Sequence, residues 1–161
     1  MDLKNLIRNI PDFPEKGIMF RDITTVLQKP DALRHAVDLM VDSVRDLDFD
    51  IVIGPESRGF IFGVPVAYIL RKGFVPVRKP GKLPYTTVKK SYSLEYGKAE
   101  LEIHTDAIIP GMRAVIIDDL LATGGTSATG RTLAAVGTRR FAFYRRTVGF
   151  DGPLPAWRGL V

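Results

Sequence analysis

The sequence predicts an α/β domain in which a twisted, mainly parallel sheet is flanked by helices. Short apolar runs at 50–54, 74–78 and 114–117 have the length and composition of strands in such a sheet. Segments with helical periodicity lie between the runs, and this alternation is typical of a parallel sheet. No repeat or linker divides the 161 residues, a length that suits one domain. We therefore expect a single domain over 1–161.

The first half of the chain is expected to form three helices and one strand. Residues 2–10 carry leucine and isoleucine at helical spacing, and the proline that follows would end that helix. Residues 11–22 are rich in proline and glycine, which predicts a loop. Pro30 opens a second helix, a buried strand is expected at 50–54, and a third helix is expected over about 57–71.

The second half is expected to form three strands separated by one long loop. The strand at 74–78 contains Pro76, which has no backbone N–H. We therefore expect the nitrogen of Pro76 to face away from the neighbouring strand. Residues 79–92 are polar, and a loop of this length is often a functional lid. The next strand, 98–104, is predicted to be half-exposed, because apolar residues alternate with Lys98, Glu100, Glu102 and His104. The last strand, 114–117, is fully apolar.

The composition excludes several classes of protein. The absence of cysteine excludes a disulfide scaffold, a cysteine nucleophile and a thiolate metal site. The run from Gly59 to Leu70 is too short to span a bilayer and contains a proline. The N-terminus has acidic Asp2 and no long apolar core, so it does not resemble a signal peptide. His35 and His104 match no metal-ligand spacing. We expect a cytoplasmic protein with no membrane partner.

The net charge of +5 is confined to the end of the chain. Residues 1–126 hold 17 basic and 17 acidic side chains, whereas 127–161 hold six arginines, one aspartate and neither lysine nor glutamate. A nucleic-acid-binding protein more often shows a basic stripe interleaved with aromatic residues. We therefore expect no nucleic-acid partner and interpret the tail as a segment of unusual composition, with nucleic-acid binding by the arginines as an alternative.

The clearest chemical signal is the run VIIDDLLATGGT, Val115–Thr126. Its strand ends at Asp118 and Asp119, and open parallel sheets bind ligands beyond the carboxyl ends of their strands. The glycines allow close backbone approach, and the hydroxyls and amides of a helix start suit a phosphate. The turn lacks the lysine of a Walker A loop. A plain strand–helix connection with a threonine cap is the alternative, but the paired carboxylates favour a ribose-phosphate site.

This run closely resembles the phosphoribosyl-diphosphate-binding motif of the type I phosphoribosyltransferases. Other segments narrow the resemblance to the adenine phosphoribosyltransferases, and they occur in that family's order: PDFP at 11–14, FRDI at 20–23, ESRGF at 56–60, RKPGKLP at 78–84 and SYSLEYGKAELE at 91–102. One such match would be weak, but six in order over residues 11–126 are highly specific.

The resemblance implies both fold and chemistry. The fold would be the type I phosphoribosyltransferase sheet with a small N-terminal arm and hood over residues 1–30. The activity would be purine salvage: transfer of ribose 5-phosphate from 5-phosphoribosyl 1-diphosphate (PRPP) to N9 of adenine, giving AMP and pyrophosphate. The resemblance further implies a homodimer and Mg²⁺, with the metal held mainly through the substrate rather than by a metal site of the protein.

The same resemblance assigns catalytic and ribose-binding roles. Asp118 and Asp119 would hold the ribose hydroxyls and favour the positive charge that builds up at C1′ as pyrophosphate leaves. Glu95 would be the catalytic carboxylate, handling a proton near N7 or N9 of adenine. Tyr96 beside it would belong to a lid that excludes water. The expected 5′-phosphate cradle is Ala122, Thr123, Gly124, Gly125 and Thr126.

Two further groups of residues follow from the resemblance. Arg58 has a planar guanidinium that can donate two hydrogen bonds to phosphate oxygens, and we expect it to act as a catalytic residue as well. The expected pyrophosphate-binding residues are Glu56, Ser57, Arg58, Arg78, Lys79 and Lys82; relatives often have aspartate at position 56. The expected adenine-binding residues are Met19, Phe20, Arg21 and Leu120, with Phe20 as a stacking surface. Considered singly, the charged residues would be interpreted as solvated surface charges, and Phe20 as part of the core.

The resemblance fails after Thr126. Gly130 weakens the expected helix by about 1 kcal/mol relative to alanine. Arg145 and Arg146 replace an apolar-acidic strand end, and a parallel sheet cannot bury both cheaply, so that strand should lie at an edge or pack poorly. A shifted reading frame, natural divergence or engineering would each give such a tail, and the coding DNA read in three frames would test the first. The alternative function is therefore a PRPP-binding or nucleotide-binding relative with little catalysis.

Overall fold

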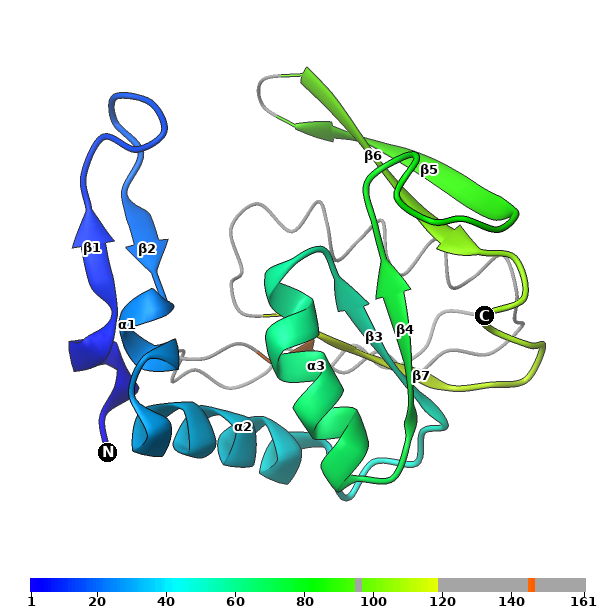
Figure 1. The fold of residues 1–161 in the computed structure, drawn as a ribbon, viewed down its shortest axis with the longest axis horizontal. Coiled ribbons are helices and arrows are strands. Elements are labelled where there is room, and N and C mark those ends of the chain that lie inside the picture. Colours follow the sequence, from blue (N-terminus) through cyan, green and yellow to red (C-terminus); the bar gives the residue numbers. More distant parts are fainter. Residues whose placement is uncertain (95–96, 119–144, 147–161) are drawn as a thin grey trace.

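The computed structural model describes residues 1–94, 97–118 and 145–146 (Figure 1). Its main sheet consists of β3 (Ile51–Pro55), β4 (Gly73–Val77), β7 (Ala114–Ile117) and β8 (Arg145–Arg146). The strands lie in the order β4-β3-β7-β8, and each neighbouring pair is parallel. The predicted α/β class with a mainly parallel sheet is confirmed.

The ends of the strand order agree with two details of the sequence. Pro76 lies in β4, which is an edge strand of this sheet, so the missing proline N–H interrupts no inner ladder. At the other end, β8 pairs through Ile116 with Arg145 and through Ile117 with Arg146. Among the strands that the structure describes, the two arginines therefore lie on an edge strand, which is one of the two outcomes expected for them.

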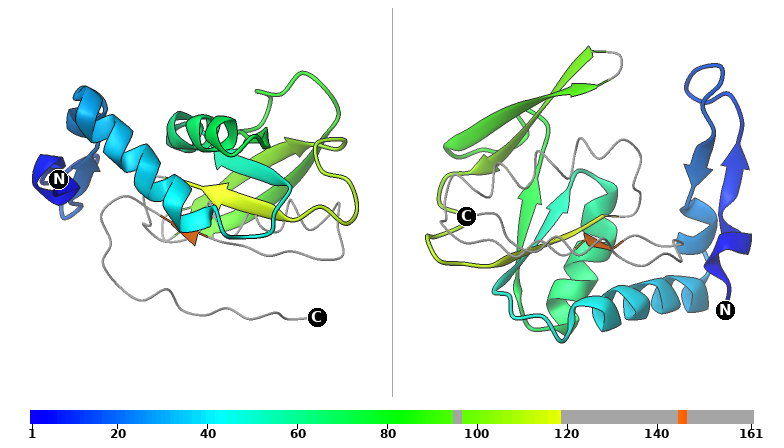
Figure 2. Two further views of the ribbon diagram at one scale, coloured as in Figure 1. Left: turned by 90° about the horizontal axis from the view of Figure 1, so that it is seen from below. Right: turned by 180° about the vertical axis from the view of Figure 1, so that it is seen from behind.

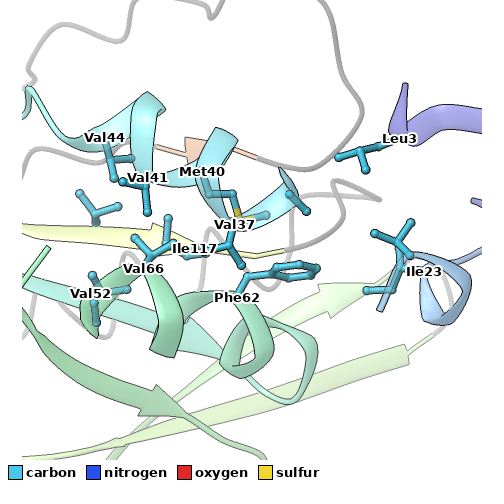
Figure 3. Close-up of a cluster of buried hydrophobic side chains, with 14 of the residues drawn as sticks. Leu3, Ile23, Val37, Met40, Val41, Val44, Val52, Phe62, Val66 and Ile117 are labelled. Carbon is cyan, nitrogen blue, oxygen red and sulfur yellow. The ribbon is translucent and has the colours of Figure 1, made fainter. Parts of the chain in front are cut away.

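Two long helices pack beside the sheet as predicted. α2 (Pro30–Val44) has proline in its first turn, where the missing N–H is tolerated, and α3 (Arg58–Ile69) lies over the sheet (Figure 1). Their buried faces form one apolar cluster with the sheet (Figure 3). Its labelled members include Val37, Met40, Val41 and Val44 from α2, Phe62 and Val66 from α3, and Val52 and Ile117 from the strands. The short helix α1 (Thr24–Leu27) precedes α2.

The opposite face of the sheet is buried as well. Ile51 and Ile53 of β3 point to a second apolar cluster, which Leu101 and Ile103 complete. Burial on both faces explains why β3 and β7 contain no polar residue, as is usual for strands of a parallel sheet. No helix in the described part of the chain is both long and apolar enough to cross a membrane.

The N-terminal prediction is partly wrong. Instead of a helix over 2–10, a 3₁₀ turn (η1, Leu3–Leu6) is followed by β1 (Arg8–Ile10), which pairs antiparallel with β2 (Phe20–Asp22). The predicted loop 11–22 thus ends in a strand. The Asp2 carboxylate accepts the Lys4 N–H (2.9 Å), which stabilises the short turn. Pairing with a distant strand outweighs the helical spacing, which sequence periodicity alone cannot detect.

The predicted loop over 79–92 is also too long. β5 (Thr87–Leu94) pairs antiparallel with β6 (Gly97–His104) over its whole length, so the loop ends at residue 86. Lys89, Lys90 and Ser91 are exposed, and this run of polar residues is why the sequence predicted a loop instead of a strand. The β1–β2 and β5–β6 hairpins rise on either side of the edge at which β3 and β4 end (Figures 1 and 2).

Candidate active site

The carboxyl ends of three parallel strands bring several predicted site residues to one edge of the sheet. Pro55 pairs with Val77, so Glu56 after β3 lies beside Arg78 after β4. β7 is in register with β3 on the other side, and Asp118 follows its last residue. We call this the carboxyl edge. Ligands of open parallel sheets bind at this position.

Glycines set the position of the turn from β3 into α3 (residues 55–59, the β3–α3 turn). A Cβ on Gly59 would lie 2.6 Å from Pro55 Cδ and 2.9 Å from the carbonyl oxygen of Ile117, so only glycine permits this approach. A Cβ on Gly54 would lie 2.6 Å from the Phe74 ring. The helix therefore begins directly against the ends of β3 and β7, which places half-buried Arg58 at the carboxyl edge.

Glu56 and Arg78, both predicted to bind pyrophosphate, contact each other. Arg78 Nε and one terminal nitrogen each lie 3.2 Å from a different carboxylate oxygen of Glu56. The Lys79 N–H donates to the same carboxylate (2.9 Å). Burial would raise the pKa of Glu56, but the Lys79 N–H and the Arg78 guanidinium outweigh it, so the pKa lies below its ordinary value.

The segment after β4 forms a basic loop (residues 78–86). Arg78 donates to the carbonyl oxygen of Lys82 (3.0 Å), and the Lys82 N–H donates to that of Lys79 (3.3 Å). Gly81 has φ +76°, which favours glycine in this turn. Lys79 and Lys82 are exposed. The loop therefore brings two lysines next to the carboxyl edge.

Glu102 is buried, contrary to the exposed position that the alternating pattern of its strand predicts. Alternation placed it on the exposed face of its strand, but its side chain is 2% exposed. Its carboxylate accepts from the Gly81 N–H (2.9 Å) and from Thr87 Oγ1 (3.2 Å), and Lys89 Nζ lies 3.7 Å away. The basic loop covers the outer face of β6 at this point, a contact that no pattern in the strand itself signals.

Three of the four predicted adenine residues, Met19, Phe20 and Arg21, lie on the hood, which is formed by the β1–β2 hairpin and α1. Phe20 is half-buried, and the Arg58 guanidinium carbon lies 5.9 Å from the centre of its ring. Phe13 packs edge-on against the same ring (5.1 Å between centres). Met19 and Arg21 are exposed, and Arg21 donates to Asn9. The structure thus brings Phe20, but not the Arg21 side chain, into contact with a residue of the β3–α3 turn.

The remaining predicted site residues lie outside the described part of the chain. They are Glu95, Tyr96, Asp119, Leu120, Ala122, Thr123, Gly124, Gly125 and Thr126. Asp118 is described and is half-buried at the end of β7. Leu94 of β5 pairs with Gly97 of β6, so the described strands pair up to either side of positions 95 and 96.

The class of protein follows from this edge together with a family match. Residues 22–144 match the family described as the phosphoribosyl transferase domain, and the chain belongs to it. The match extends past Thr126, where the resemblance in the sequence had ended. A parallel sheet with the loops of its carboxyl edge beside a separate hood is the architecture that the resemblance implied.

Within that family, several proteins that are highly similar to this chain share one name. An adenine phosphoribosyltransferase of Caldicellulosiruptor saccharolyticus is 64% identical over 127 residues, which are 79% of this chain and 73% of the relative. The structure of the Thermoanaerobacter pseudethanolicus enzyme of that name matches with a TM-score of 0.82 and 49% identity, over 88% of this chain and 84% of that one. The chain thus belongs to the adenine phosphoribosyltransferases.

A third comparison concerns a protein solved with ligands. The adenine phosphoribosyltransferase of Saccharomyces cerevisiae, complexed with adenine and an imino-altritol 1,6-bisphosphate, is 35% identical with a TM-score of 0.77. The similarity covers 89% of this chain and 85% of the yeast chain. Nothing in these comparisons favours the alternative of a relative with little catalysis.

Proposed function

We propose that this chain transfers ribose 5-phosphate from PRPP to N9 of adenine, giving AMP and pyrophosphate in purine salvage. The observation that carries the proposal is its 64% identity over 127 residues to a protein named adenine phosphoribosyltransferase. The carboxyl edge supports it, because cationic and carboxylate side chains from separate segments meet there beside an aromatic ring of the hood. The yeast relative, solved with adenine, supports the choice of base.

The described residues suggest how the leaving pyrophosphate would be held. Lys79 and Lys82 are exposed on the basic loop, and Arg58 begins α3. Cations here would stabilise the charge that develops on pyrophosphate as the C1′ bond breaks. Glu56 and Ser57 would shape this subsite, and Arg78 would act from its pair with Glu56.

The other subsites follow from the resemblance. Asp118 and Asp119 would bind the ribose hydroxyls, residues 122–126 the 5′-phosphate, and Phe20 one face of adenine together with Met19, Arg21 and Leu120. Glu95 would handle the proton of the base, with Tyr96 excluding water. Polar, phosphorylated substrates of this kind suit the cytoplasm, which we propose as the location.

The residues fit a magnesium ion that arrives with its substrate. Mg²⁺ prefers oxygen ligands and is usually held by one or two carboxylates together with substrate phosphates. In the described ranges, no three His, Cys, Asp or Glu side chains gather as a protein-only site would need, while Asp118 offers a carboxylate at the carboxyl edge. When bound, the ion would neutralise charge on the diphosphate.

The proposal includes a homodimer. Ile61, Val64 and Tyr68 recur along one face of α3 and are 39%, 47% and 84% exposed. An apolar face of this kind is typical of a subunit interface. Light scattering should give twice the mass of one chain, and Tyr68→Glu should shift the protein towards monomer. A monomeric wild-type protein would refute the dimer.

The activity is tested by AMP formation from adenine and PRPP with Mg²⁺, followed by chromatography. We expect turnover with adenine and at least about a hundredfold less with hypoxanthine or guanine, since a mismatched base leaves polar groups unpaired. Glu95→Ala should lower kcat by about 10²–10⁴ if it acts in proton transfer. Glu100→Ala, on the exposed face of β6, is the matched control and should keep full activity. A folded protein that binds PRPP without turnover would overturn the proposal.

A further inference from the structure

Glu102 is a charged side chain placed where burial is costly. Its side chain is only 2% exposed, and it is the one buried polar or charged side chain among the residues that the structure describes. A buried carboxylate costs several kcal/mol unless its oxygens are paired. A well-packed apolar residue at this position would serve stability as well or better. The charge therefore calls for a reason other than packing.

The partners of Glu102 lie along the whole basic loop. Its backbone exchanges two hydrogen bonds with Arg78 at the start of the loop (3.0 and 2.8 Å). One carboxylate oxygen accepts from the Gly81 N–H in the middle (2.9 Å), and the other accepts from Thr87 Oγ1 just after the loop (3.2 Å). The backbone of Leu83 also lowers the pKa of the Glu102 carboxyl. Glu102 thus holds the loop at its start through its backbone, and in its middle and at its end through its carboxylate.

The loop held in this way carries the exposed lysines of the proposed pyrophosphate subsite. Arg78 is tied to Glu56 on the other side, so the start of the loop is fixed by two glutamates, one through backbone and one through side-chain contacts. Lys79 and Lys82 follow within this fixed segment and remain exposed. Their long side chains reach a diphosphate only if their backbone is in place.

We infer that Glu102 is a positioning residue, which holds the basic loop so that Lys79 and Lys82 face the diphosphate of PRPP and the pyrophosphate product. The inference rests on the proposed function. Glu102 itself contacts no substrate, because its side chain is buried beneath the loop. Lys89, 3.7 Å from the carboxylate, balances part of its charge from β5.

The test compares Glu102→Gln with Glu100→Gln on the same strand. The Glu102→Gln substitution keeps the shape of the side chain but removes its charge. It also replaces one acceptor oxygen with an NH₂ group, which cannot accept a hydrogen bond from the donors of the loop. Glu100 is exposed and bonds to Ser91 across the hairpin (2.8 Å), so its variant controls for any change in the hairpin. The readouts are the Kd of pyrophosphate with Mg²⁺ by calorimetry and the separate KM and kcat of AMP formation.

Glu102→Gln should raise the pyrophosphate Kd and the KM for PRPP by about tenfold, the loss expected for charge-assisted hydrogen bonds to one carboxylate. The KM for adenine should stay within about twofold, because the hood carries the base. Equal losses in the two KM values, or a lower kcat with unchanged KM for PRPP, would overturn the inference. An inactive wild-type protein would instead count against the proposed function.

Thr87→Val provides a second variant where Glu102→Gln fails to fold. It removes one donor to the carboxylate and nearly preserves the volume of the side chain. The KM for PRPP should rise by about threefold, with the KM for adenine unchanged. An unchanged KM for PRPP in this folded variant would contradict the positioning role.

Discussion

The β3–α3 turn and the basic loop meet at the same edge of the sheet, but different forces hold them. In the turn, Gly59 lets the backbone of α3 pack directly against Pro55 and the Ile117 carbonyl. In the loop, the Glu56 and Glu102 carboxylates accept N–H groups from exposed segments. Close packing does not depend on ionisation, whereas a carboxylate holds its donors well only while it is charged.

The difference shows how one site can combine a fixed part with an adjustable part. Arg58 is carried by a helix that close packing fixes, so its place should persist under any condition in which the sheet is folded. Lys79 and Lys82 are carried by a loop whose position depends on the charges of Glu56 and Glu102. Substitutions should therefore affect the turn through stability and the loop through affinity for pyrophosphate.

The largest effect is expected from breaking the packed turn with Gly59→Ala. The added methyl would meet Pro55 and the Ile117 backbone at under 3.0 Å, and neither can move without shifting a strand. We expect a loss of about 1–3 kcal/mol in the free energy of unfolding, as for overpacked cores. Gly73→Ala is the control, since its Cβ would lie 3.5 Å or more from its neighbours.

Urea denaturation of both variants decides this prediction. The unfolding midpoint of Gly59→Ala should fall well below that of Gly73→Ala, with a similar dependence on urea. Equal midpoints would mean that the turn is not held by close packing, and the contrast between turn and loop would be lost.

A smaller effect is expected from Glu56→Asp, which shortens the carboxylate arm by one methylene. The aspartate can no longer reach both the Arg78 fork and the Lys79 N–H at the present distances of 2.9–3.2 Å. We expect the pyrophosphate Kd to rise by about three- to fivefold, with little change in stability. Calorimetry measures this Kd, with Glu100→Asp as the control variant. A loss of stability comparable to that of Gly59→Ala would show that the loop is part of the packed core.

The smallest effect concerns the contact between hood and turn. Phe20→Leu removes the ring that faces Arg58 at 5.9 Å. The coupling between Phe20→Leu and Arg58→Gln in a double-mutant cycle of unfolding should be about 0.5 kcal/mol, the low end for a cation–π pair near the surface. Strictly additive effects would show that the hood and the turn are independent.

The sequence predicted the sheet better than the hairpins, for a physical reason. Strands such as 114–117 are apolar because both faces are buried, so composition alone reveals them. β1 and β5 depend on pairing with β2 and β6, and pairing leaves no mark within one strand. Residues 2–10 were predicted as a helix and residues 87–92 as a loop, because the local sequence carries no information about the strand with which each of them pairs.

For the candidate site, the sequence predicted which strand ends carry Glu56, Arg58 and Arg78, but not the contacts that these residues make; their roles stay predictions. Glu56, Arg58 and Arg78 were expected at strand ends, and the parallel register brings them to one edge. The Glu56–Arg78 pair could not be foreseen, because it needs the pairing of Pro55 with Val77. Glu102 was assigned to the exposed face, since alternation cannot show that a loop from another part of the chain covers it.

The effect of pH separates the two segments most directly. Burial would raise the pKa of Glu102 and of Glu56, but in both the hydrogen bonds and nearby cations outweigh it and hold the pKa below the ordinary value of 4.5. The stabilisation from these carboxylates is therefore complete above about pH 4.5 and is lost as the pH falls through the folded-state values. Glu56 belongs by sequence to the β3–α3 turn, but the close packing of Gly59 against Pro55 and Ile117 that holds this turn has no such dependence.

The decisive measurement is amide hydrogen exchange by mass spectrometry, corrected for intrinsic rates, from about pH 7 to about pH 3.5. Protection of residues 79–87 should fall on acidification by a larger factor than protection of residues 54–66, and Glu102→Gln should show the low loop protection already at neutral pH. Equal losses in both segments, or a loop whose protection does not change with pH, would contradict the account.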